Sequence, residues 1–182
     1  MPIYVAMLRG INIGPHKRMK MDKLRLCFES LGLEEVKTYI QSGNIVFRGA
    51  KFSDRALAKK LEDLIERDFG FSAAVITRTR DELGRVIEDN PLVKQRGIVE
   101  SRLHVVFLSG PPTAASLKTL EELTRPPDRM RNLEREIYFY FPNGVSGSSL
   151  WKHPLDRILT VTATMRNWTT VNKLYEMARD LG

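Results

Sequence analysis

Three short polar segments carry the residues best suited to chemistry. The first is residues 9–15, RGINIGP, which follow a short apolar run and lead through a basic stretch into a helical pattern. Backbone N–H groups of a glycine-bearing loop, with a helix N-terminus behind them, can hold an anion. Arg9 adds a bidentate donor and Asn12 a polar side chain, so this segment is suited to a phosphate or carboxylate group.

The other two segments each have a sufficient structural explanation. Residues 41–44, QSGN, are typical of a hairpin turn in which glycine adopts a positive φ. Asn167 follows Arg166 and can cap the helix that comes next, with Trp168 packing at the helix start. Taken alone, neither segment indicates a ligand.

The expected topology brings these segments together. In a β-α-β-β-α-β unit the first and third strands are adjacent and antiparallel, so residues 9–14 should lie beside residues 41–44. The approach of Arg166 and Asn167 depends on how the two halves dock. Because guanidinium groups without a carboxylate repel each other, such a patch is best explained as an anion site. The predicted ligand-binding residues are Arg9, Asn12, Lys20, Gln41, Ser42, Asn44, Arg166 and Asn167.

Covalent catalysis finds little support in the sequence. Cys27, the only cysteine, falls on an apolar stripe with Leu24 and Leu31, where a thiol is usually inert packing. The chain has no GxSxG elbow and no GxxxxGK(S/T) or GxGxxG phosphate loop. One cysteine excludes an intramolecular disulfide, and no Cys/His spacing fits a metal. We therefore expect neither a metal nor a cofactor, and binding is favoured over catalysis.

Apolar spacing predicts the elements that must position these residues in the first half. Short apolar or β-branched runs favour strands, and apolar residues at helical spacing favour amphipathic helices. Ser53 is suited to capping the second helix, and residues 79–82, TRDE, form a capping box for a further short helix. The expected strands are residues 3–8, 36–40, 45–47 and 71–77, and the expected helices are residues 21–31 and 53–70.

The second half repeats the same order. The expected strands are residues 104–108, 130–133, 137–141 and 160–164, and the expected helices are residues 113–123, 150–159 and a C-terminal helix through Leu181. Pro154 must lie in the first turn of its helix or break it. Residues 138–141, YFYF, place aromatic rings on both faces of one strand, and we expect one pair at an interface between the halves.

The resulting prediction is an α+β fold of two tandem ferredoxin-like (βαββαβ) halves with a C-terminal helix. The first half is residues 1–78, the connection with its short helix is residues 79–102, and the second half with the C-terminal helix is residues 103–182. A chain of 182 residues is long enough to bury a core without disulfides or metals.

Composition limits the partners. Lys plus Arg outnumber Asp plus Glu by 29 to 22, which gives a formal net charge of +7. This charge is spread along most of the chain, so nucleic-acid binding is expected to be weak and non-specific if it occurs. No signal peptide and no apolar run of membrane-spanning length are recognised, so no membrane partner and a cytoplasmic location are expected. The oligomeric state is left open.

The three motifs also resemble a known family. Residues 8–14 (LRGINIG), 39–44 (YIQSGN) and 166–171 (RNWTTV), with Lys20 and Met21, are similar to the bacterial family called "domain of unknown function 1697". The resemblance implies two ferredoxin-like units and no assigned activity. The chain departs from the family at Gly14-Pro15, where Gly-Gly is frequent, at Ser149, where Lys is frequent, and at Met165, where Thr is frequent.

Three functions remain open from the sequence. The favoured one is a non-catalytic binding module with a polar, basic pocket for an anionic, phosphate-bearing small molecule. The second is an enzyme that acts on such a ligand by positioning and electrostatics, without a covalent nucleophile. The third is a protein-interaction module that uses exposed sheet faces. A carboxylate or histidine with a shifted pKa in the pocket would favour the enzyme.

Overall fold

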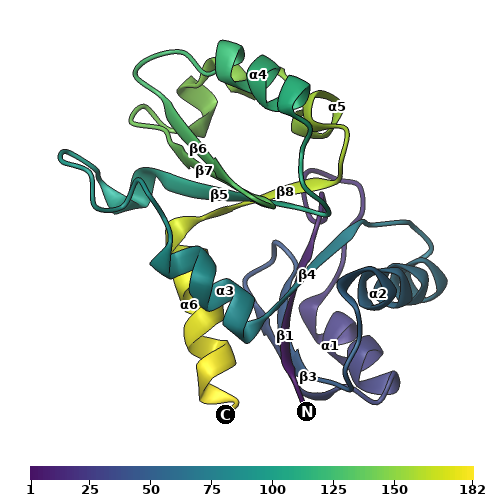
Figure 1. Cartoon of the computed structure of the whole chain (residues 1–182). Helices are drawn as coiled ribbons and strands as arrows, with labels where there is room; N and C mark the ends of the chain where they lie inside the picture. Colours follow the sequence, from purple (N-terminus) through teal and green to yellow (C-terminus); the bar gives the residue numbers. More distant parts are fainter. The chain divides into compact units, whose positions relative to one another are not determined.

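The computed structural model describes residues 1–182 and divides into two units, each built on one four-stranded antiparallel sheet (Figure 1). The first unit comprises Met1–Arg85 and Lys173–Gly182, and the second comprises Val86–Asn172. The predicted mixed α+β class is therefore confirmed. No helix combines the length and the apolar character needed to cross a membrane.

The first unit has the strand order β2-β3-β1-β4. Its elements are β1 (Ile3–Leu8), α1 (Met21–Ser30), β2 (Glu34–Tyr39), β3 (Asn44–Arg48), α2 (Asp54–Phe69), β4 (Val75–Thr79) and the start of α3 (Arg80–Glu88). Apolar side chains of α1 and α2 pack on one face of this sheet, around residues such as Leu24, Phe28, Phe47 and Leu61, all fully buried. The amphipathic spacing seen in the sequence therefore becomes the core of the unit.

The second unit has the corresponding order β6-β7-β5-β8. Its elements are β5 (Leu103–Leu108), α4 (Ala114–Leu123), β6 (Arg129–Leu133), β7 (Glu136–Tyr140), α5 (Leu155–Leu159), β8 (Ala163–Asn167) and the start of α6 (Trp168–Asp180). Short 3-10 helices cover Glu100–Arg102, Val145–Gly147 and Ser149–Lys152. The core on the helical side includes Val106, Leu120 and Phe139, which are fully buried.

Three predicted boundaries were wrong. The strand expected at residues 71–77 is Val75–Thr79, and the strand expected at residues 160–164 is Ala163–Asn167. The second error arose because Thr160 is β-branched but ends α5 in the left-handed conformation, with φ 57°. The helix expected at residues 150–159 is interrupted, because Pro154 has no N–H to continue it and stands as the N-cap of α5.

The tyrosines of β7 are held inside the second unit by the segment before β5. Tyr138 Oη donates a hydrogen bond to the Val86 carbonyl oxygen at 3.0 Å, and Tyr140 Oη donates to the Gly97 carbonyl oxygen at 3.3 Å. Burial raises the pKa of Tyr138, so its hydroxyl stays a donor at neutral pH. The segment expected to be a short helix and a connection therefore also supplies hydrogen-bond acceptors to this sheet.

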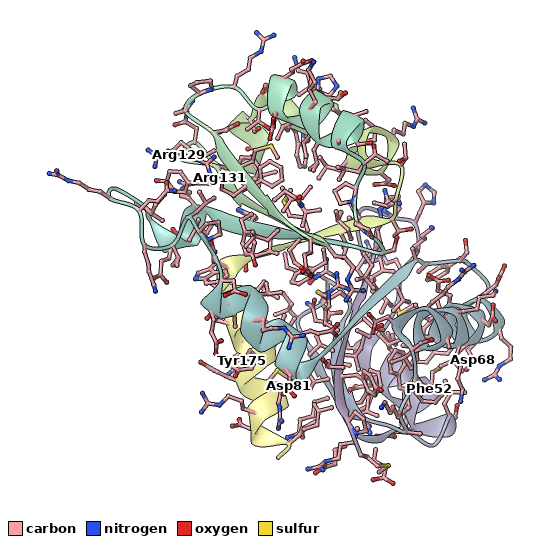
Figure 2. The ribbon with its side chains drawn as sticks, in the orientation of Figure 1. Phe52, Asp68, Asp81, Arg129, Arg131 and Tyr175 are labelled. Carbon is pink, nitrogen blue, oxygen red and sulfur yellow. The ribbon has the colours of Figure 1, made fainter.

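The C-terminal helix is divided between the two units. Its residues up to Asn172 are grouped with the second unit, and its last part, from Lys173, is grouped with the first. There Tyr175 of α6 packs against α3, on which Asp81 is also labelled (Figure 2). A Cβ built on Gly84 would lie 3.1 Å from the Tyr175 ring, so the two helices approach closely at this glycine. Sequence periodicity identified both helices but not this pairing.

Candidate functional site

The loop after β1 is fixed on two sides within the first unit. Leu8 N–H donates to the Gly43 carbonyl oxygen at 2.8 Å, and Arg9 N–H donates to the Ala74 carbonyl oxygen at 2.9 Å. Lys17 Nζ reaches the Ser72 carbonyl oxygen at 2.8 Å. We call residues 9–20 together with residues 40–44 the loop–turn cluster. Its two parts adjoin as the antiparallel pairing of β1 with β3 requires, which confirms the predicted adjacency.

Asn12 is the clamp of this cluster. Its Nδ2 donates to the Met19 carbonyl oxygen at 2.9 Å and to the Gln41 carbonyl oxygen at 2.8 Å. Its Oδ1 accepts a hydrogen bond from the Met19 N–H at 2.7 Å. Both amide hydrogens are therefore used inside the protein, so Asn12 shapes the loop rather than offering donors to a ligand.

Asn44 and Ser42 have a similar role in the turn. Asn44 is fully buried, and its Nδ2 donates to the Tyr39 carbonyl oxygen at 3.1 Å and to Ser42 Oγ at 2.8 Å. Gly43 between them has φ 78°, and a Cβ there would lie 2.7 Å from Leu8 Cβ. The turn thus needs glycine both for its conformation and for its contact with the end of β1.

The backbone of the cluster is unusually rich in left-handed residues. Gly10, Asn12, Gly14 and Lys17 in the loop all have positive φ, as does Ile40 at 50° before the turn. A β-branched residue is rare in this conformation, and Ile40 is also half exposed. Such strain persists only where surrounding contacts enforce it, and the clamp through Asn12 supplies those contacts here.

Cationic side chains surround this rigid backbone. Arg9, Lys17, Arg18 and Lys20 are all exposed, and the cluster contains no carboxylate. The helix α1 begins directly after Lys20, whose side chain makes no capping hydrogen bond to the first turn. The positive end of the helix dipole therefore adds to the charge of the loop, although Asp22 in the first turn offsets part of it.

The remaining two candidates lie in the second unit. Arg166 is 8% exposed, and its Nη1 donates to Thr164 Oγ1 at 2.8 Å and to the Met165 carbonyl oxygen at 2.9 Å. Burial lowers the pKa of its guanidinium to about 10, which still leaves it charged at neutral pH. Asn167 Oδ1 accepts from the Thr170 N–H at 2.8 Å and so caps α6, as expected. Their approach to the loop–turn cluster stays a prediction.

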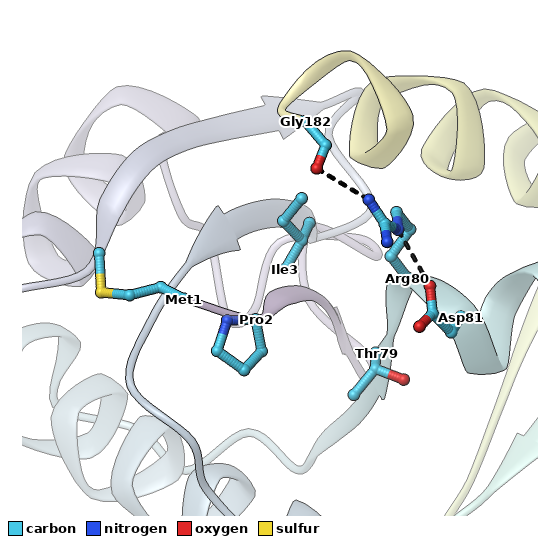
Figure 3. Close-up of a pocket in the computed structure, with 7 residues that line it drawn as sticks. All are labelled: Met1, Pro2, Ile3, Thr79, Arg80, Asp81 and Gly182. Atoms are coloured by element: carbon cyan, nitrogen blue, oxygen red, sulfur yellow. Dashed lines mark hydrogen bonds and ion pairs between the residues drawn. The ribbon is translucent and has the colours of Figure 1, made fainter.

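A pocket that the sequence did not indicate lies at the opposite end of β1 (Figure 3). Its volume is about 200 Å³. Arg80 crosses it, with Nη1 donating to the Gly182 carbonyl oxygen at 2.8 Å and Nε paired with Asp81 Oδ1 at 3.0 Å. This arginine is already held by two acceptors, one of them a carboxylate. It is lined by Met1, Pro2, Ile3, Thr79, Arg80, Asp81 and Gly182.

Groups for other chemistry are not assembled. No three His, Cys, Asp or Glu side chains are placed to hold a metal ion. Cys27 is 7% exposed, and burial together with a hydrogen bond to Asp68 raises the pKa of its thiol to about 11. The predicted burial of Cys27 is confirmed, and the thiol is protonated at neutral pH.

Comparison with known proteins gives a family and a fold. The model of a family described as "Protein of unknown function (DUF1697)" matches residues 1–138. A solved structure, that of the conserved bacterial protein SP0830 from Streptococcus pneumoniae, is similar with a TM-score of 0.79 and 26% identity. The similarity covers 97% of this chain and 98% of that one. No curated protein matches the chain.

Proposed function

Since the chain belongs to the DUF1697 family of proteins of unknown function, we propose its function from geometry: the loop–turn cluster binds a phosphate-bearing or otherwise anionic small molecule. In this proposal Arg9, Arg18 and Lys20 supply positive charge. Backbone N–H groups of the loop supply directed hydrogen bonds. The observation that carries the proposal is a rigid, carboxylate-free cluster of exposed cations in front of an uncapped helix start.

The clamp through Asn12 supports this proposal because it prepares the loop in advance. Its amide joins residue 12 to Met19 and to Gln41, which is 29 positions away in the sequence. A preformed loop loses little conformational entropy when a ligand binds. Asn12, Ser42 and Asn44 thus act as supports. The exposed side chains of Arg9, Arg18, Lys20 and Gln41 are the candidates for direct contact.

The catalytic alternative would have to depend on one residue. The cluster holds no carboxylate and no cysteine, so His16 is its only candidate for a general acid or base. His16 is exposed, and the cluster offers it no carboxylate partner. Binding without catalysis therefore accounts for the geometry with fewer assumptions.

We also propose that each half is a ferredoxin-like unit. Residues 1–78 hold the first, and residues 103–182 hold the second together with the C-terminal helix, whose last part is grouped with the first unit. The strand orders β2-β3-β1-β4 and β6-β7-β5-β8 correspond position by position, and both sheets are antiparallel throughout. The matching strand orders support the proposal that the same fold occurs twice in the chain. The proposal matters for function because it makes the loops after β1 and β5 equivalent, and only the first carries the basic cluster.

Titration of the 15N-labelled protein with pyrophosphate, followed by amide chemical shifts, tests the binding proposal. We expect saturable shifts in residues 9–20 and 40–44. Replacing one arginine by alanine removes a charge-assisted hydrogen bond, so R9A and R18A should each weaken binding about tenfold. Stability should change little, because exposed cationic side chains contribute little to folding.

A matched control is Arg55→Ala on α2, which removes an equally exposed arginine from the same unit. It should leave the pyrophosphate affinity within about twofold, as expected for a charge outside the site. Equal weakening by R55A and R9A would mean that the shifts report net charge alone. Shifts centred on Arg80 instead would assign the anion to the pocket in Figure 3.

A further inference from the structure

The edge strands of the two sheets differ in a way that bears on binding. In the first sheet the edge strand β2 is irregular, since its register with β3 shifts between Glu34 and Lys37 and Glu35 has φ 51°. A bulged edge resists pairing with another chain. In the second sheet the corresponding edge strand β6 pairs with β7 without interruption over all five residues. Its backbone is therefore regular enough to pair with an added strand, which would displace the hydrogen bond that Arg131 Nη1 donates to the Met130 carbonyl oxygen.

The side chains of β6 alternate between two environments. Met130 faces the core and is 8% exposed, whereas Arg129, Arg131 and Leu133 point to the other face and are exposed. Figure 2 shows both arginines at this edge of the sheet. On a strand, residues two positions apart stand on the same face, so the two guanidinium groups form a short basic row.

The row is partly preorganised. Arg129 Nη1 donates to Gln95 Oε1 at 3.2 Å, and its guanidinium lies 5.7 Å from the centre of the Tyr140 ring. Arg131 Nη1 donates to the Met130 carbonyl oxygen at 2.7 Å. Lys94 and Arg96 flank Gln95 in the chain and are also exposed. Two held arginines beside further cations favour an acidic partner.

Charge also excludes the most obvious alternative, a second copy of this chain. Antiparallel pairing of two β6 strands about their middle residue would place Arg131 opposite Arg131. Like charges directly opposite each other destabilise a strand pair. An acidic strand would instead meet opposite charges at Arg129 and Arg131, with an apolar residue suited to the position of Leu133.

We propose that β6 is a docking edge for an extended acidic peptide segment of a partner protein, which adds as a fifth strand to the second sheet. Backbone hydrogen bonds along the edge supply affinity. Acidic side chains at alternate positions of the partner, facing Arg129 and Arg131, supply selectivity. This surface lies in the second unit and does not depend on the loop–turn cluster.

The test uses the full-length 15N-labelled protein and blocked hexapeptides of alternating valine and glutamate. We expect shifts and slowed amide exchange along β6 on adding this peptide. The lysine counterpart should not bind. A glutamate peptide N-methylated at alternate residues should also fail, because it keeps the charge and loses the backbone hydrogen bonds. The charge-reversed double variant R129E/R131E should bind the glutamate peptide about tenfold more weakly and gain affinity for the lysine peptide.

Arg157→Glu on α5 is the control, because it reverses the charge of a single exposed arginine in the same unit. It should leave the affinity within about twofold. If the double variant fails to fold, binding of the three peptides to the unmodified protein tests the proposal instead. The proposal is overturned by absence of binding at millimolar peptide, by equal binding of the N-methylated peptide, or by shifts away from β6. Preference of β6 for oligodeoxythymidylate over the glutamate peptide would also overturn it.

Discussion

Single polar side chains in this protein act mainly by fixing backbone. Asn12 donates both amide hydrogens to the carbonyl oxygens of Met19 and Gln41. Asn44 donates its amide hydrogens to the Tyr39 carbonyl oxygen and to Ser42 Oγ. Each of these side chains satisfies backbone groups that would otherwise need water. A motif rich in amides can therefore mark a shaped loop, and the ligand contacts then fall to its exposed cations.

Gly43 provides a direct test of how tightly the turn is packed. G43A should lower the free energy of unfolding by about 2–4 kcal/mol, because alanine is strained at this positive φ and its Cβ collides with Leu8. Gly14 has φ 66° but open space around a Cβ, so G14A should cost only about 1 kcal/mol. Urea denaturation measures both. Equal losses would show that conformation alone, and not the contact with β1, requires glycine at position 43.

Cys27 makes a prediction about pH. Its thiol has an ordinary pKa of 9.0, and burial with the Asp68 hydrogen bond raises this to about 11 in the folded protein. Above pH 9 the unfolded thiol loses its proton while the folded one keeps it, so the free energy of unfolding falls as pH rises toward 11. Because other groups titrate in this range, the measurement is the difference from C27A, whose decline should be shallower. Parallel pH profiles would contradict the assignment.

At the scale of elements, capping decides where helices begin. Thr79 and Glu82 form the reciprocal capping box expected from residues 79–82: Glu82 N–H donates to Thr79 Oγ1 at 3.2 Å, and Thr79 N–H donates to Glu82 Oε2 at 2.8 Å. Ser53 and Thr113 cap α2 and α4 in the same way on one side only. These local rules placed the helix starts correctly because they involve residues three positions apart.

The contributions of Thr79 and Glu82 to the stability of the α3 capping box can be measured together. T79A should lower the free energy of unfolding by about 1 kcal/mol, since it leaves the Glu82 N–H without its acceptor. S53A at the simpler cap of α2 is the matched comparison. A double-mutant cycle with E82A should give a coupling between positions 79 and 82, because each side chain serves the other's backbone. A coupling of zero would mean that the two hydrogen bonds form independently or not at all in solution.

At the scale of the whole molecule, the net charge of +7 makes a separate prediction. Any binding of single-stranded DNA should be weak, should show no sequence preference and should weaken steeply with salt. The reason is that the positive charges are spread over both units, while Tyr138 and Tyr140 are buried and unavailable for stacking on bases. Fluorescence anisotropy at about 50 and about 200 mM salt measures the affinity for single-stranded DNA and its dependence on salt. Tight binding that survives the higher salt would require a stacking surface elsewhere.

The sequence by itself determined the α+β class, the order of elements in each half and the adjacency of the loop after β1 to the turn before β3. Each of these follows from apolar periodicity, local caps and the pairing rules of antiparallel strands, which act over short distances or through topology. The strand boundary that failed at Thr160 is a place where a β-branched residue adopts a left-handed backbone conformation, whereas Pro154 breaks its helix in one of the two ways that the sequence allowed.

Only the tertiary structure decided what the polar residues do. Asn12 could have faced a ligand or the protein, and the carbonyl oxygen of Gln41, distant in sequence, settles that it faces the protein. In the same way, the regular register of β6 and the bulge in β2 cannot be read from either strand alone, because register is a property of a strand and its neighbour together. Hydrogen bonds between residues far apart in the chain become definite only once packing has fixed where each backbone lies.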